Sequence, residues 1–158
     1  MATVVLSVGF SDAFYTTSSS RPPSTFAADD LQLNLSRSGE LLDGGNLKPG
    51  AKRTGTVTVT NAEHKASVTL SASGLSNTPP EKTLATVIDV TVRETSPATA
   101  TRYSGKLQDL DAAPLGTFAH QQQRSYAIEI SWPAGETDPG LAGVTTSFVF
   151  EWLAESVP

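Results

Sequence analysis

The stretch TGTVTVTNAEHKASVTLSAS, residues 54–73, alternates apolar and polar side chains in two successive runs. The apolar positions are Val57, Val59, Ala66, Val68, Leu70 and Ala72. A period of two is that of a β-strand with one buried face. The short polar loop between the runs predicts that residues 54–60 and 66–72 form a hairpin.

The same period recurs along most of the chain, in DLQLNLS, VIDVTV, SYAIEISW and SFVFEW. The repeating apolar residues are Leu31, Leu33, Leu35, Ile88, Val90, Val92, Tyr126, Ile128, Ile130, Trp132, Phe148, Phe150 and Trp152. Turn signals separate these runs, such as Pro49-Gly50, SNTPPEK, TSPATAT and the break at Pro133. GKLQDLDAAPLG has room for one short helical turn. Short strands at this spacing predict an all-β sandwich or barrel.

The length and net charge of the chain limit the kinds of protein that it could be. The 158 residues suggest one domain, and a chain of this size can bury a core without disulfides. The chain has no cysteine, so it forms no disulfides. A formal net charge of −5 argues against nucleic-acid specificity and against a polybasic membrane-surface protein. No apolar run reaches the roughly 18 residues that span a bilayer.

The N-terminal segment combines an apolar strand with a polar tether. One side of the strand carries Ala2, Val4, Leu6, Val8 and Phe10. The sequence TTSSSRPPST, residues 16–25, follows, and its Ser, Thr and Pro content is typical of an extended linker. The expected organisation is an extended strand over 1–15, a linker over 16–25 and a β-sandwich over 26–158.

No residue pattern indicates catalysis. His64 and His120 stand beside turns, outside any H-E-x-x-H motif, and we interpret them as solvated loop residues. The acidic pairs are Asp29-Asp30, Asp109 with Asp111, and Glu136 with Asp138, which we interpret as solvated acids near turns. Nucleophile-elbow, Walker and dinucleotide-binding motifs do not occur. We therefore expect no enzyme activity, no catalytic residues, no metal site and no cofactor.

The aromatic residues divide into two groups. Trp132 and Trp152 are in phase with the apolar residues of their own strands, which favours core packing over a sugar-binding platform. Tyr15 and Tyr103 lie outside the strong strand patterns, and their role stays open at this stage.

Read together, several segments resemble the TasA/camelysin family of exported biofilm-matrix fibre proteins, which is related to archaeal bundling pili. Phe10-Ser11-Asp12 is similar to the family's aromatic-S-D motif, and TFAADDLQL, residues 25–33, to its T-F-x-A-G-x-L-D-L segment. NLKPG, YSGKLQDL and TSFVFEW are similar to later family segments, in the same order. The resemblance implies a jelly-roll-like antiparallel β-sandwich and a secreted subunit of an extracellular fibre.

Such fibres assemble by donor-strand exchange, which gives the N-terminal strand an expected role. A strand supplied by a neighbouring copy would complete an open sandwich by β-augmentation. The expected partners are identical subunits, with other matrix proteins or polysaccharide as further possibilities. Two alternatives stay open for residues 2–10: pairing within their own domain, or a signal-peptide remnant. The alternative functions are a camelysin-like metalloprotease and an adhesion or carbohydrate-binding module that uses loops such as 133–145.

Overall fold

The computed structural model describes residues 2–8, 33–39, 47, 49–62, 64–136, 138–141 and 144–157. The strands within these residues are β1 (Ala2–Val8), β2 (Leu33–Gly39), β3 (Lys52–Asn61), β4 (Ala66–Thr78), β5 (Asp89–Ser96), β6 (Ala100–Lys106), β7 (Ala113–Phe118), β8 (Gln123–Ser131) and β9 (Thr145–Ser156). Two short 3-10 helices, η2 (Leu107–Asp109) and η3 (Pro139–Leu141), lie in the connections. The η2 turn lies within GKLQDLDAAPLG, where the sequence has room for one short helical turn at most.

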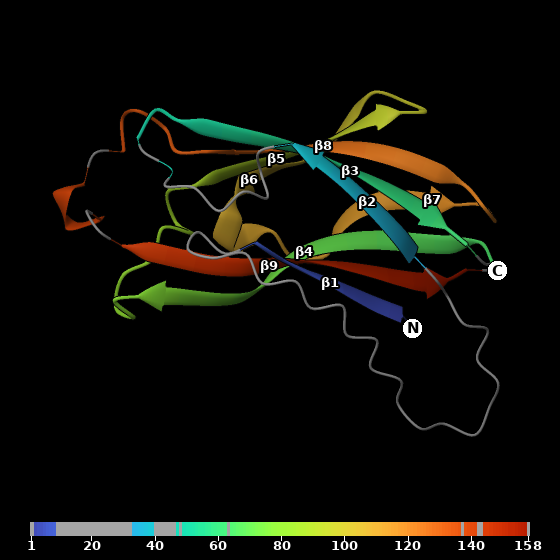
Figure 1. Ribbon diagram of the computed structural model, residues 1–158, viewed down its shortest axis with the longest axis horizontal. Coiled ribbons are helices and arrows are strands. Elements are labelled where there is room, and N and C mark those ends of the chain that lie inside the picture. Colours follow the sequence, from blue (N-terminus) through green and yellow to red (C-terminus); the bar gives the residue numbers. More distant parts are fainter. Residues whose placement is uncertain are drawn as a thin grey trace, which may run out of the picture.

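The strands form two layers (Figure 1). Sheet A has the strand order β1-β9-β4-β7, and sheet B has the order β2-β3-β8-β5-β6. All of the paired strands are antiparallel. The prediction of an all-β antiparallel sandwich is therefore confirmed.

The strand order is that of a jelly roll. If β2 is left aside, consecutive strands alternate between the layers, except that β5 and β6 pair with each other in sheet B. Counted in chain order, they run 1-8-3-6 in one sheet and 2-7-4-5 in the other, which is the double Greek key of a jelly roll. Strand β2 is an addition at the edge of sheet B, beside β3.

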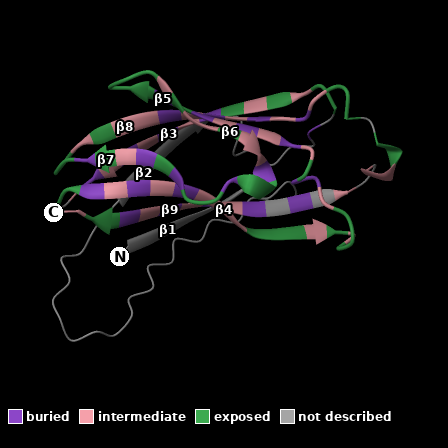
Figure 2. Ribbon diagram, turned by 180° about the vertical axis from the view of Figure 1, so that it is seen from behind, coloured by how far each residue is buried: buried purple, intermediate pink, exposed green. Residues whose placement is uncertain are grey.

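The alternating sequence pattern produces the core. Along β3 and β8 every second residue is buried, and the partners between them face outward (Figure 2). The largest fully buried side chains are Trp152, Tyr126, Phe118, Phe148, Phe150, Leu70, Ile88, Leu107, Leu110, Leu115, Ile128 and Ile130. Because successive strand residues point to opposite faces, the inner faces of both sheets meet in one apolar layer.

The predicted hairpin between residues 54–60 and 66–72 is wrong. β3 belongs to sheet B and β4 to sheet A, so the loop between them turns a corner from one layer to the other. Asn61 stabilises this corner, because its buried Nδ2 donates to the carbonyl oxygens of His64 at 2.7 Å and Ala119 at 3.0 Å. The valines of β3 and the apolar residues of β4 thus belong to opposite sheets of one core rather than lying side by side.

Candidate assembly site

Strand β1 lies at the edge of sheet A and pairs with β9 without a register shift. The residues of the expected polymerisation strand occupy matched positions: Ala2 opposite Ala154, Val4 opposite Trp152, Leu6 opposite Phe150 and Val8 opposite Phe148. All four β9 partners are buried. Because residues directly opposite each other in an antiparallel pair share a face, these β1 positions belong to the core-facing set.

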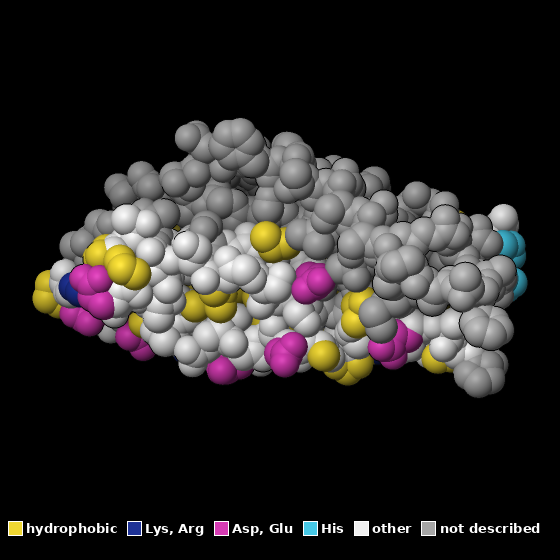
Figure 3. All heavy atoms as spheres, turned by 90° about the horizontal axis from the view of Figure 1, so that it is seen from below, with side chains coloured by type: hydrophobic (Ala, Val, Ile, Leu, Met, Phe, Trp, Pro, Cys, Tyr) yellow, Lys and Arg dark blue, Asp and Glu magenta, His cyan; other side chains and the backbone are white. Residues whose placement is uncertain are grey.

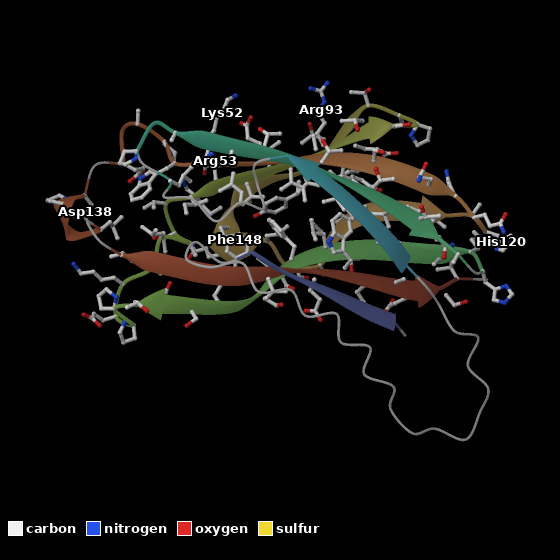
Figure 4. The ribbon with its side chains drawn as sticks, viewed as in Figure 1. Lys52, Arg53, Arg93, His120, Asp138 and Phe148 are labelled. Atoms are coloured by element: carbon white, nitrogen blue, oxygen red, sulfur yellow. The ribbon has the colours of Figure 1, made fainter. Side chains whose placement is uncertain are left out.

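Strand β9 presents a buried aromatic row to the interior. Phe148, Phe150 and Trp152 alternate along its inner face, and each is 2% exposed or less. The rings of Phe148 and Phe150 pack edge to face at 5.0 Å, and Trp152 packs against Tyr126 of sheet B at 5.8 Å. Figure 4 places Phe148 between the two sheets, beside β1.

Two strands flank this aromatic row within sheet A. On one side β4 places Leu70 opposite Trp152 and Ala72 opposite Phe150. On the other side only β1 is paired with β9. Removal of β1 would open the backbone edge of β9 and one flank of the aromatic row together. We call the β9 edge with this row the β1 seat.

In this single chain β1 occupies its own seat, which is the self-pairing arrangement considered from the sequence. Exchange between copies involves a second chain and stays a prediction, as does the polymerisation role of Ala2, Val4, Leu6, Val8 and Phe10. Phe10, the linker over 16–25 and the proposed domain boundary at residue 26 lie outside the described residues.

A buried ionic cluster closes the opposite side of the sandwich, where the edge strands β6 and β7 approach each other. Glu94 of β5 is fully buried, and its carboxylate accepts hydrogen bonds from Arg102 Nε at 2.8 Å and Arg124 Nη1 at 3.4 Å. The Arg102 Nη2 group also pairs with this carboxylate. Two cations thus surround one buried anion.

Arg124 also links the two sheets. From β8 of sheet B, its Nη2 donates to the Thr117 carbonyl of β7 at 2.7 Å, and its guanidinium lies 4.8 Å from the centre of the Phe118 ring. Tyr126 Oη donates to the Leu115 carbonyl at 3.1 Å. Burial and the nearby Glu94 carboxylate raise the pKa of Tyr126 to about 12. The sequence reasoning missed this cluster, which acts as a clasp between the layers.

The residues weighed for metal or catalytic roles lie at the surface, and His64 and His120 lie at the same corner, where Asn61 Nδ2 bonds the carbonyl oxygens of His64 and Ala119. His64 and His120 are exposed beside turns, as expected. Asp109 ends η2, Asp111 accepts a bond from Ser71 at 3.4 Å, and Asp138 accepts one from the Gly140 amide at 2.7 Å. Among the described residues no group of three or more His, Cys, Asp or Glu could hold a metal ion. Asp29 and Asp30 lie outside the described residues.

The aromatic predictions are answered for three of the four residues. Trp152 is fully buried and Trp132 is 8% exposed, which confirms core packing for both. Tyr103 lies on the edge strand β6, half-buried, and its Oη donates to the Lys106 carbonyl at 2.6 Å. Burial and the charge of Asp109 raise the pKa of Tyr103. Tyr15 lies outside the described residues.

No family model matches the chain, and no curated protein matches it. The TasA/camelysin resemblance therefore stays a prediction from the sequence motifs. In the part of the chain that the structure describes, no helix is long and apolar enough to cross a membrane.

Proposed function

We propose that the chain is the structural subunit of an extracellular biofilm-matrix fibre, and that copies join head to tail by exchanging β1. The observation that supports this proposal is the position of β1: an edge strand that pairs with β9 alone and fills a seat lined by buried aromatic residues. An edge strand can be replaced by an identical strand from a neighbour without any change to the rest of the sheet.

The sequence leaves enough chain for such an exchange. Residues 9–32 separate β1 from β2, and 24 residues extend over about 80 Å at most. Each fully buried Val or Leu side chain of the donated strand contributes about 1.5–3 kcal/mol before ordering costs. Because a self-paired and an exchanged β1 use the same seat, their contacts are equivalent, and protein concentration shifts the balance between them.

The exchanged contact is heterologous, because the donated β1 of one copy binds a different surface, the β9 edge, of the next. Such a contact gives an open chain of copies unless its rotation closes a ring. Each copy donates β1 at one place and accepts the next copy's β1 at the β9 edge, which gives an open filament. Identical subunits are thus the primary partners. Secretion and a place in the extracellular matrix rest on the sequence resemblance to TasA/camelysin proteins.

Imaging of a deletion variant tests the proposal. Purified wild-type chain should form long threads under negative stain, and a variant lacking residues 2–12 should form none. A synthetic peptide of residues 2–12 should bind the deletion variant and raise its thermal midpoint, because it refills the seat without linking copies. Threads from the deletion variant, or no threads from the wild type at any concentration, would contradict the proposal.

A matched pair of substitutions in β1 compares a charge placed at the β1 seat with the same charge placed on the other face of the strand. Leu6 lies opposite buried Phe150, so Leu6→Asp should abolish threads. Ser7 lies opposite half-buried Val149 on the other face, so Ser7→Asp should leave threads intact. Zinc content and glycan binding of the same preparations test the two alternative functions, which predict a bound zinc and saturable binding respectively.

A further inference from the structure

We propose that the outer edge of β1 pairs with the same edge of a second copy, so that two copies of sheet A join side by side. This contact uses the side of β1 that faces away from β9. It is therefore independent of whether β1 sits in its own seat or in a neighbour's. The described sandwich has four edge strands, which are β1 and β7 in sheet A and β2 and β6 in sheet B.

Exposed edge strands are sites of unwanted pairing, and proteins protect them with prolines, charges, bulges or short length. Strand β7 is protected in several ways. It contains Pro114, which lacks an N–H, and its pairing with β4 is shifted by a bulge. Side chains from sheet B already bond the carbonyl groups of Leu115 and Thr117. Another strand would meet an irregular edge there.

Strand β6 is protected by charge. Arg102 and Lys106 lie on it, with Arg102 bound to Glu94 and Lys106 paired with Asp89 at 2.8 Å. The Lys106 carbonyl is taken by Tyr103 Oη. The pairing of β6 with β5 also contains a register shift. An added strand would have to displace these side chains.

Strand β2 carries a different protection. Arg37 occupies the register position opposite Val57, whose side chain is fully buried. A charged residue within an edge strand is one of the devices that block edge-to-edge pairing. Gly39 ends the strand, and glycine weakens strand pairing.

Within its described residues, Ala2–Val8, strand β1 has none of these protections. Its sequence ATVVLSV contains no charged residue, proline or glycine, and its seven pairs with β9 run without a shift. Val, Leu and Thr favour extended pairing. Among the edges of the described strands, this one lacks the charges, proline, glycine and register shifts found on the other three.

The sequence of β1 also complements itself in antiparallel pairing. With Val5 opposite Val5 of the second copy, Val4 meets Leu6, Thr3 meets Ser7, and Ala2 meets Val8. Apolar residues of the core-facing set then meet apolar residues, and two hydroxyl pairs form on the other face. No like charges oppose each other, so a second copy of this chain is the partner that fits.

The outer face of sheet A is less suited to self-association than its edge. Glu151 and Glu155 of β9 lie on this face, and Figure 3 shows acidic side chains spread over this side of the molecule. Stacking two such faces would bring like charges together. Edge pairing instead extends the four strands of sheet A into a continuous sheet across two copies.

Single-cysteine cross-linking tests this contact, because the chain has no cysteine of its own. Directly opposite antiparallel residues have Cα atoms about 4.5–5.5 Å apart, which a disulfide can span. Val5→Cys should give a disulfide-linked dimer under mild oxidation, ~10-fold faster than the matched variant Thr101→Cys on the protected β6 edge. Equal rates for the two variants would overturn the proposal.

A second measurement covers the case in which the cysteine perturbs the strand. Val5→Lys places two like charges opposite each other at the centre of the contact, and should lower the fraction of paired copies in sedimentation. Circular dichroism checks that this variant is folded. An unchanged sedimentation profile at every concentration would also overturn the proposal. If threads form in the imaging experiment but Val5→Cys does not cross-link, head-to-tail exchange stands and this edge contact fails.

Discussion

At the scale of single residues, Glu94 is the side chain on which the clasp between the sheets depends. Replacing it with Gln keeps the shape but removes the charge that both Arg102 and Arg124 contact. Breaking a buried ion pair in this way leaves uncompensated charge in the interior and destabilises by about 3–5 kcal/mol. We expect Glu94→Gln to lower the free energy of unfolding by that amount, measured by urea denaturation at pH 7.

The control for this experiment is an exposed ion pair. Glu129 pairs with Lys52 at 3.1 Å, and its side chain is 38% exposed. Exposed pairs contribute roughly 0–1 kcal/mol, so Glu129→Gln should have little effect. Similar losses for the two variants would show that the Glu94 cluster is not a structural clasp.

Tyr126 gives the fold a predictable response to alkaline pH. Its pKa is raised to about 12 in the folded chain by burial and by Glu94, against 10.0 for an ordinary tyrosine. The unfolded chain therefore loses the phenolic proton first, and stability falls as pH rises from about 10 towards 12. The difference amounts to about 3 kcal/mol at most.

Urea midpoints measured between pH 8 and 12 test this response. The fall should be smaller in Tyr126→Phe, which has no titrating group at this position. That variant also loses the bond to the Leu115 carbonyl, so its midpoint should lie below the wild-type value at pH 8, and this gap should narrow as the pH rises towards 12. Identical pH profiles for the two proteins would contradict the assignment to Tyr126.

The structural role of some residues could be predicted from the sequence, whereas that of Glu94 could not. Trp132 and Trp152 could be assigned to the core because each continues the apolar alternation of its strand. Glu94 could not, because its partners lie 8 and 30 residues further along the chain. Only the pairing of β5 with β6 and β8 brings these charges together. Local patterns carry no information about that pairing.

At the scale of elements, the bulge in β7 depends on a glycine. Gly116 has φ +108, and a Cβ there would lie 3.1 Å from Arg124 Nη1. That guanidinium is held by Glu94 and the Thr117 carbonyl, so it cannot easily move. We expect Gly116→Ala to destabilise by about 1–3 kcal/mol in thermal or urea unfolding.

Gly135 provides the matched control, since no described atom lies within 4 Å of the Cβ that an alanine would add. Gly135→Ala should change stability by about 0.5 kcal/mol or less, as expected for a surface substitution away from packed groups. An equal effect at the two glycines would mean that the β7 bulge needs no special backbone.

Strands with a regular apolar alternation could be predicted from the sequence. The edge strands β6 and β7, which lack that alternation, could not. β3, β4, β5, β8 and β9 each contain one of the recognised alternating runs. The sequence around β6 and β7 instead shows turn signals and room for a short helical turn. Their sequences, ATRYSGK and APLGTF, contain the charges, glycines and proline that blunt an edge. The residues that protect these two strands from edge pairing also interrupt the apolar alternation by which a strand is recognised in a sequence.

At the scale of the whole molecule, the sandwich could be predicted but the assignment of strands to sheets could not. Two adjacent alternating runs suggest a hairpin, yet β3 and β4 lie in different layers. Loop length alone does not distinguish a hairpin turn from a corner between sheets. The jelly-roll order depends on which inner faces cover each other, and this is decided by long-range packing of the aromatic and aliphatic core.

The central claim for the molecule is that β1 can leave its own β9 seat and fill that of the next copy. A disulfide between β1 and β9 can prevent this movement, because Ser7 lies opposite Val149. The double variant Ser7→Cys/Val149→Cys, oxidised as a monomer, keeps β1 in its own seat. The control variant Ser67→Cys/Glu155→Cys places a disulfide between β4 and β9 and leaves β1 untethered.

The most direct measurement is the growth of threads from these two oxidised variants, followed by light scattering and negative-stain imaging. We expect the tethered β1 variant to stay monomeric until reductant is added and then to polymerise at the wild-type rate. The control variant should polymerise with or without reductant. Threads formed by the oxidised β1 variant, with its intramolecular disulfide verified by mass spectrometry, would contradict strand exchange.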